Sequence, residues 1–174
     1  MTRHAAFLRG VNLGRRTVRS AELKSAFEAL GYEDVKTLLA SGNVLFDAKP
    51  GKGLKQQIEA GLKAQFGFDV PIVLRTLDAL KAMVAANPFG RKADEDAQLH
   101  VLLVDPALPA GFSFPGLAGD YDVARIAPGE IFFIVHRKPD GTYLGRSQLA
   151  VDKVVPKGAI ATMRNWNTIL KAVA

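Results

Sequence analysis

The sequence predicts an α+β fold made of two related subdomains, each an antiparallel sheet with helices on one face. The first half of the chain reads as strand-helix-strand-strand-helix-strand, and the second half is a rough echo of this order without a residue-level repeat. The 174 residues are 48% hydrophobic and 23% charged, which is typical of globular domains. We therefore expect a ferredoxin-like βαββαβ subdomain over 1–76 and a second α+β subdomain over 77–174. The alternative is one compact domain.

The first elements are marked by their hydrophobic spacing and by turn residues. A short apolar strand is expected over 5–11, followed by a loop rich in Gly and Arg that runs to Arg19. Ser20 has the properties of an N-cap residue, and apolar residues on one face predict a helix from there to Gly31. This part of the chain therefore supplies the first strand and the first helix of the subdomain.

A hairpin, a second helix and a fourth strand complete the first subdomain. Segments over 35–40 and 43–46 have strand character and are separated by a Ser-Gly pair, which predicts a tight antiparallel hairpin. The second helix is predicted by apolar residues at every fourth position, namely Leu54, Ile58, Leu62 and Phe66. A strand over 70–75 follows it.

The second half alternates helices, strands and one irregular stretch. A helix that starts near Leu77 is expected to end at Asn87, because the residue before a proline avoids the helical conformation. The segments expected next are a strand, an irregular proline-rich stretch and a hairpin, at 99–104, at 105–119, and at 121–127 with 130–136. The apolar run at 131–135 predicts a central strand buried on both faces. Two helices capped by Ser147 and Asn165 complete the chain.

Composition excludes several classes of protein. The chain contains no cysteine, so disulfides, thiolate nucleophiles and cysteine-ligated zinc are absent. Its apolar runs are far shorter than the roughly 18 residues that a membrane helix needs. Arg9 interrupts the apolar N-terminal stretch, so we expect no secretory signal and a cytoplasmic location. The three histidines lie far apart in the sequence, and we expect neither a metal nor a cofactor.

The positive charge is concentrated at the two ends of the chain. The net charge is +6 and the isoelectric point is near 9.7. Residues 1–20 contain five arginines and no acidic residue, and residues 137–174 contain seven basic and two acidic residues. A fold that brings the two ends together would form one positive patch suited to an anion. Separate solvated faces are the alternative.

Three sequence blocks resemble the bacterial domain-of-unknown-function family 1697. They read FLRGVNLG at 7–14, TLLASGNVLF at 37–46 and TMRNWNT at 162–168. The chain departs from the family pattern at Arg15, where members often have Gly, and at Gln148, where members often have Lys. The resemblance implies a cytoplasmic α+β protein with ferredoxin-like units, and it implies no agreed activity.

The same blocks are rich in hydrogen-bond donors and poor in acids. Arginine suits phosphate or carboxylate, serine and asparagine add neutral hydrogen bonds, and the first amides of a helix attract anions. We therefore predict a small anionic ligand, phosphorylated or carboxylate, bound between the two halves. The predicted ligand-binding residues are Arg9, Asn12, Ser41, Asn43, Arg146, Ser147, Arg164, Asn165 and Asn167. Each Ser and Asn has a purely structural alternative as a helix cap or a turn residue.

Two other functions compete with this hypothesis. A four-stranded sheet with basic loops could bind nucleic acid, in which case Arg15, Arg16 and Arg19 would matter as much as Arg9. Open sheet edges could instead make the protein an interaction module. The sequence identifies no catalytic acid or base, so turnover is not predicted and the oligomeric state is left open.

Overall fold

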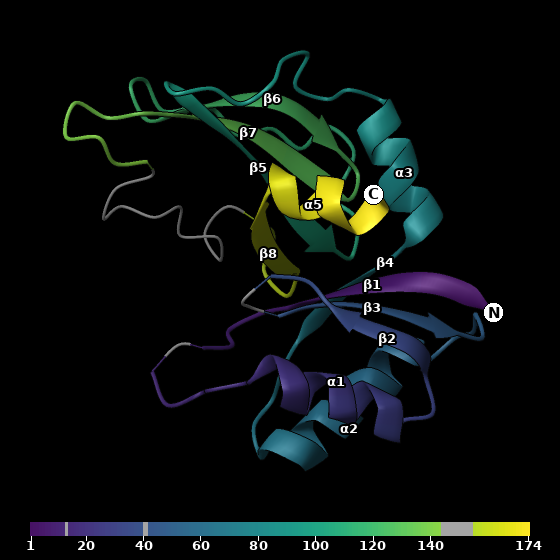
Figure 1. Ribbon diagram of the computed structural model, residues 1–174. Helices are drawn as coiled ribbons and strands as arrows, with labels where there is room; N and C mark the ends of the chain where they lie inside the picture. Colours follow the sequence, from purple (N-terminus) through teal and green to yellow (C-terminus); the bar gives the residue numbers. More distant parts are fainter. Residues whose placement is uncertain (13, 40–41, 144–154) are drawn as a thin grey trace. The chain divides into compact units, whose positions relative to one another are not determined.

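A computed structural model describes residues 1–12, 14–39, 42–143 and 155–174 of the chain. They form two compact units, Met1–Ala82 with Leu170–Ala174 and Met83–Ile169. Each unit contains one four-stranded antiparallel sheet, which confirms the predicted α+β fold class (Figure 1). A domain boundary after Thr76 stays a prediction. Within the ranges given above, no helix is long and apolar enough to cross a membrane.

The first unit has the predicted strand-helix-strand-strand-helix-strand order. Its elements are β1 (Thr2–Leu8), α1 (Ser20–Ala29), β2 (Glu33–Thr37), β3 (Asn43–Ala48), α2 (Leu54–Phe66) and β4 (Ile72–Thr76). The strands lie side by side as β2-β3-β1-β4, and every neighbouring pair is antiparallel. This is the strand order of a ferredoxin-like unit.

Helices α1 and α2 cover one face of this sheet (Figure 1). The residues that they bury are those of the predicted apolar stripes, Leu23, Ala26 and Phe27 from α1 and Leu54, Ile58 and Leu62 from α2. Phe27 meets Phe46 of β3 with ring centroids 5.1 Å apart. The core of the unit therefore follows directly from the spacing of apolar residues along the two helices.

Several predicted boundaries of the first unit are wrong. Strand β2 covers Glu33–Thr37 instead of 35–40, so it ends before the predicted Ser-Gly turn, and β4 covers Ile72–Thr76 instead of 70–75. Strand β1 runs over Thr2–Leu8 instead of 5–11, because backbone pairing with β3 begins at Thr2 whatever the polarity of the side chain. Ser20 is the first residue of α1 rather than its N-cap. Arg19 takes the cap position, and its backbone N–H donates to the Glu22 carboxylate at 3.4 Å, which is one half of a capping box.

The second sheet repeats the strand order of the first. Its elements, with the helices that precede and follow them, are α3 (Leu77–Ala85), β5 (Ala97–Asp105), β6 (Tyr121–Ala127), β7 (Glu130–His136), β8 (Ile160–Asn165) and α5 (Trp166–Val173). The strands lie as β6-β7-β5-β8 and are again antiparallel throughout. The predicted central strand is confirmed as β7, whose Ile131 and Phe133 are fully buried.

The second unit covers its sheet differently. The connection from β5 to β6, residues 106–120, contains no helix, as the sequence predicts. Its Leu108, Phe112 and Phe114 pack against one face of the sheet. On the other face, Trp166 lies within 5.1 Å of Phe89 and 6.0 Å of Phe132, measured between ring centroids. The short helix predicted from Ser147 lies outside the described residues, apart from its last position.

Candidate functional site

The side chain of Asn12 folds the connection between β1 and α1 back on itself. The backbone N–H of Asn12 donates to the Arg16 carbonyl oxygen at 2.6 Å, and its side-chain Oδ1 accepts from the Val18 N–H at 2.9 Å. Its φ of 59° lies in the left-handed region, which asparagine tolerates better than most residues. The carboxamide oxygen of Asn12 is therefore used within the loop, where it holds the backbone at Val18. Ligand contacts from this loop would come from the neighbouring side chains.

We call residues 9–19 the basic loop, because it contains four arginines and no acidic residue. Arg15, Arg16 and Arg19 are exposed, and none of them has an ion pair in the described part of the chain. The Arg16 guanidinium lies 5.7 Å from the centre of the Phe68 ring, a cation–π distance. Its Nη1 is 3.8 Å from the point where a Cβ on Gly10 would lie. The hydrogen bonds of Asn12 thus bring Arg16 close to Gly10, the residue that follows Arg9.

The hairpin between β2 and β3 contributes Asn43, which is buried. Its Nδ2 donates to the Leu38 carbonyl at 3.1 Å, and its own carbonyl accepts from the Leu38 N–H at 2.9 Å. Asn43 pairs with Phe7 of β1, so it lies next to the end of the strand that leads into the basic loop. The structure gives Asn43 a role in closing the hairpin. The neighbouring Ser41 lies outside the described residues.

In the second unit, Arg164 lies on β8 opposite Val101 of β5. Its Nη1 donates to the Thr162 Oγ1 at 2.6 Å and to the Met163 carbonyl at 2.9 Å. Burial lowers the pKa of Arg164 to about 10, because removal from water disfavours the charged form. The side chain is still a cation at neutral pH.

Asn165 confirms its predicted role as the cap of the last helix. Its Oδ1 accepts from the backbone N–H of Asn167 at 2.9 Å, which satisfies one of the first amides of α5. Asn167 itself is exposed. The other two predicted residues of this half, Arg146 and Ser147, lie outside the described residues. The described candidates thus divide between the two units, with Arg9, Asn12 and Asn43 in the first and Arg164, Asn165 and Asn167 in the second.

The fold also pairs residues that the sequence left separate. His136 Nε2 lies 2.7 Å from Asp122 Oδ2, and Lys138 Nζ lies 3.4 Å from Asp120 Oδ2. The signal was the register of the predicted hairpin, which sets the start of β6 beside the end of β7. No group of three metal-binding side chains occurs among the residues that the structure describes. These pairs join the two strands.

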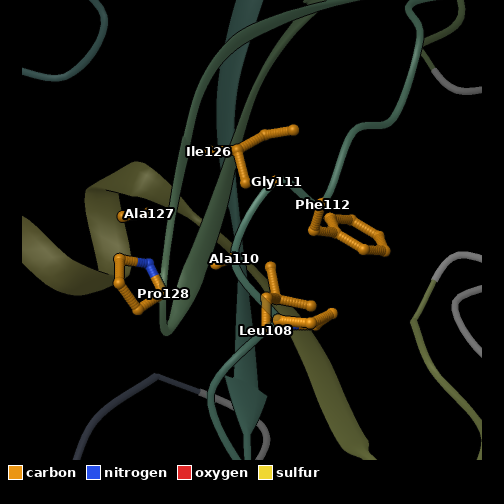
Figure 2. A pocket seen from close by; sticks show the side chains of 8 residues that line it. Leu108, Ala110, Gly111, Phe112, Ile126, Ala127 and Pro128 are labelled. Atoms are coloured by element: carbon orange, nitrogen blue, oxygen red, sulfur yellow. The ribbon is translucent and has the colours of Figure 1, made fainter.

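A hollow of about 190 Å³ in the second unit contains none of the predicted residues (Figure 2). It lies between residues 108–112 and the turn of the β6–β7 hairpin, and the side chains of Leu108, Phe112, Ile126 and Pro128 surround it. None of the side chains that line it carries a charge that would hold an anion. The hollow is therefore separate from the anion hypothesis.

Fold and site define an α+β protein with two ferredoxin-like sheets, one of which carries an arginine-rich loop. Residues 1–131 match the family described as "Protein of unknown function (DUF1697)", and the chain belongs to this family. The whole chain is similar in fold to the conserved bacterial protein SP0830 from Streptococcus pneumoniae, with a TM-score of 0.71 and 22% sequence identity over 99% of this chain and 97% of that one. No curated protein matches the sequence. The family match confirms the resemblance, and the block at 162–168 lies outside the matched residues.

Proposed function

We propose that this protein binds a small anion, a phosphate or carboxylate group of a larger ligand, at the basic loop of the first unit. The observation that carries the proposal is a loop with four arginines and no acidic residue, closed by Asn12, in which the Arg16 guanidinium lies over Phe68 and near Gly10. Guanidinium groups suit phosphate and carboxylate because their N–H donors match two oxygens at once.

The electrostatics of the loop support the same ligand class. Four arginines with no acidic residue among them concentrate positive charge on one loop, and such a concentration attracts an anion. The first acidic residue in the sequence is Glu22, and its carboxylate accepts from the Arg19 backbone N–H. The two hydrogen bonds of Asn12 close the loop without a ligand, and a loop that is ordered beforehand lowers the entropy cost of binding.

The other predicted residues have supporting roles in the proposal or stay untested predictions. Arg9 begins the basic loop and would contact the anion together with Arg16. Asn43 would support the loop from the hairpin. Contacts from Arg164, Asn165 and Asn167 of the second unit, and from Ser41, Arg146 and Ser147, stay predictions.

The experiment is a calorimetric titration of the purified protein with inorganic phosphate, and then with sugar phosphates and short carboxylates at low and moderate salt. Replacement of Arg16 by Ala should weaken phosphate binding about tenfold, the effect of one charge-assisted contact. The matched control is Arg125→Ala, which removes one exposed arginine from β6 of the second unit. Equal affinities for the wild type and R16A, or no binding at all, would contradict the proposal.

Nucleic acid is the second candidate ligand, and the three exposed arginines of the basic loop favour it. Arg15, Arg16 and Arg19 are spread along the loop, as successive backbone phosphates would require, and Phe68 is half-buried beside them. Binding of a short RNA would then fall steeply as salt rises, and each of the three arginines would contribute. A salt-sensitive affinity for RNA without measurable phosphate binding would replace the first proposal with this one.

A further inference from the structure

The two sheets match each other residue by residue, beginning at the hairpin glycines. In the first unit, the Leu8 N–H donates to the Gly42 carbonyl at 2.8 Å. In the second unit, the Val104 N–H donates to the Gly129 carbonyl at 2.9 Å. Both bonds join the end of the unit's first strand to the turn of its hairpin. Leu8 is thus the counterpart of Val104, and Gly42 is the counterpart of Gly129.

The match continues across the strands in register. Strands β1 and β5 each contain a histidine that is paired on one side with a fully buried phenylalanine. On the other side, the histidine is paired with the last residue of the edge strand, β4 or β8. The two rows are Phe46–His4–Thr76 and Phe133–His100–Asn165. Both outer hairpin strands carry a register shift, between Glu33 and Lys36 in β2 and between Val123 and Arg125 in β6. In each case a basic residue follows the shift.

The match makes Arg75 the counterpart of Arg164. Each lies one residue before the end of its edge strand, and each donates from Nη1 to the carbonyl of the preceding residue, at 3.0 Å for Arg75 and 2.9 Å for Arg164. The next residue caps the following helix in both units. Thr76 Oγ1 accepts from the Ala79 N–H at 3.1 Å, as Asn165 does for its own helix. The two arginines share this hydrogen bond to the backbone, and Arg164 adds one to the Thr162 Oγ1, where the first unit has Val73.

What differs between the units is the connection that follows the matched strand end. The residue after Leu8 is Arg9, whereas the residue after Val104 is Asp105. The basic loop contains four arginines and no acid, whereas residues 105–120 contain two acids and no lysine or arginine. The hairpin shows the same change, since Asn43 follows Gly42 and Glu130 follows Gly129. The connection that follows the matched strand end is therefore rich in arginine in the first unit, whereas its charged residues in the second unit are all acidic.

We infer that the chain is an internal duplication of one four-stranded unit. Arg75 and Arg164 are then the same structural residue in the two copies. Anion recognition belongs to the basic loop of the first copy. This inference rests on the proposed function and narrows its site. The features that both copies share are those that a four-stranded sheet needs to fold. The loop that they do not share is where the chemistry has diverged.

The test compares Arg75→Lys and Arg164→Lys in the full-length protein. Lysine keeps the positive charge and loses the planar fork. Both substitutions should lower Tm, and Arg164→Lys should lower it more because it also disturbs the bond to the Thr162 Oγ1. Both should leave the affinity for inorganic phosphate within about twofold of wild type, within the scatter for a residue that does not touch the ligand. R16A should do the reverse, with weaker phosphate binding and a nearly unchanged Tm.

A second measurement needs no variant. Calorimetry of the wild type should give one phosphate bound per chain, because only the first of the two matched connections, the basic loop, is rich in arginine. Two equivalent phosphates per chain, or an R164K protein of wild-type Tm that binds phosphate about tenfold more weakly, would overturn the inference and leave the proposed function standing. No phosphate binding by the wild type would instead contradict the proposed function, and the Tm values of R75K and R164K would then decide whether the two arginines are equivalent.

Discussion

Replacement of His4 by phenylalanine should make the protein more stable and less sensitive to acid. His4 is 5% exposed, its ring is stacked 5.5 Å from Phe46, and neither ring nitrogen has a hydrogen-bond partner in the part of the chain that the structure describes. A buried polar group without a partner costs about 1–3 kcal/mol. Phenylalanine keeps the stacked ring and removes both nitrogens, so we expect the free energy of unfolding at neutral pH to rise by about 1 kcal/mol or more.

The pH dependence follows from the direction of the His4 pKa. Burial lowers this pKa below its ordinary value of 6.5, and the Asp47 carboxylate opposes part of that effect. Below pH 6.5 the unfolded chain therefore binds more protons than the folded chain. The stability is complete above this pH and falls as the pH drops toward the folded pKa, by at most about 1.4 kcal/mol per pH unit for one histidine. Burial lowers the pKa of His100 in the same direction.

Urea denaturation of the wild type and H4F across about pH 5 to 8, the range in which histidine titrates, measures both effects. In H4F, the loss of unfolding free energy at low pH should be smaller than in the wild type, because only the part that comes from His100 remains. The matched control is His100→Phe, which removes a hydrogen bond of 3.0 Å with Gln98 and should therefore destabilise the protein at neutral pH. An H4F protein with the acid sensitivity of the wild type, or with lower stability at neutral pH, would refute this reasoning.

Three further substitutions test local features of the two units by chemical denaturation. Gly42→Ala should cost more than about 1 kcal/mol, because the residue has a φ of 67° and the new Cβ would lie 3.1 Å from the Leu8 Cβ; a stability equal to wild type would contradict this. Asn12→Ala should cost about 1 kcal/mol and also weaken phosphate binding, since the loop loses its closing hydrogen bond; unchanged affinity would separate the loop shape from binding. Asn165→Ala should cost about 1 kcal/mol as a lost helix cap, whereas the exposed Asn167→Ala should stay near zero.

Local patterns predicted most of the secondary structure. The helices α1 and α2 follow from apolar residues on one face, and the β6–β7 hairpin follows from a short turn sequence between apolar strands. The bounds of β2 were missed, because this strand is mostly exposed and carries little hydrophobic signal. The central place of β7 follows from its uninterrupted apolar run, because a strand with such residues on both faces has to be covered on both. The boundary of β1 was missed because strand pairing extends over polar residues that carry no hydrophobic signal.

The candidate site was predictable in composition but not in geometry. The sequence identified Arg9 and Asn12 as neighbours, whereas the use of the Asn12 side chain to close the loop depends on a turn that no local pattern specifies. The contact between Arg16 and Phe68 joins residues far apart in the chain and has no sequence signature. Asn43 and Asn165 had both a ligand role and a structural role open, and their hydrogen bonds within the fold support the structural one.

The sequence by itself determined the class of fold, the absence of cysteine chemistry, the family and the concentration of positive charge near the N-terminus. These properties depend on composition and on short-range spacing, which the chain carries whatever its fold. The tertiary structure alone decided which residues of the two sheets correspond, as in the pair Arg75 and Arg164. That correspondence follows from strand register and backbone hydrogen bonds. It cannot be seen in the sequence, because many different side chains are compatible with the same register.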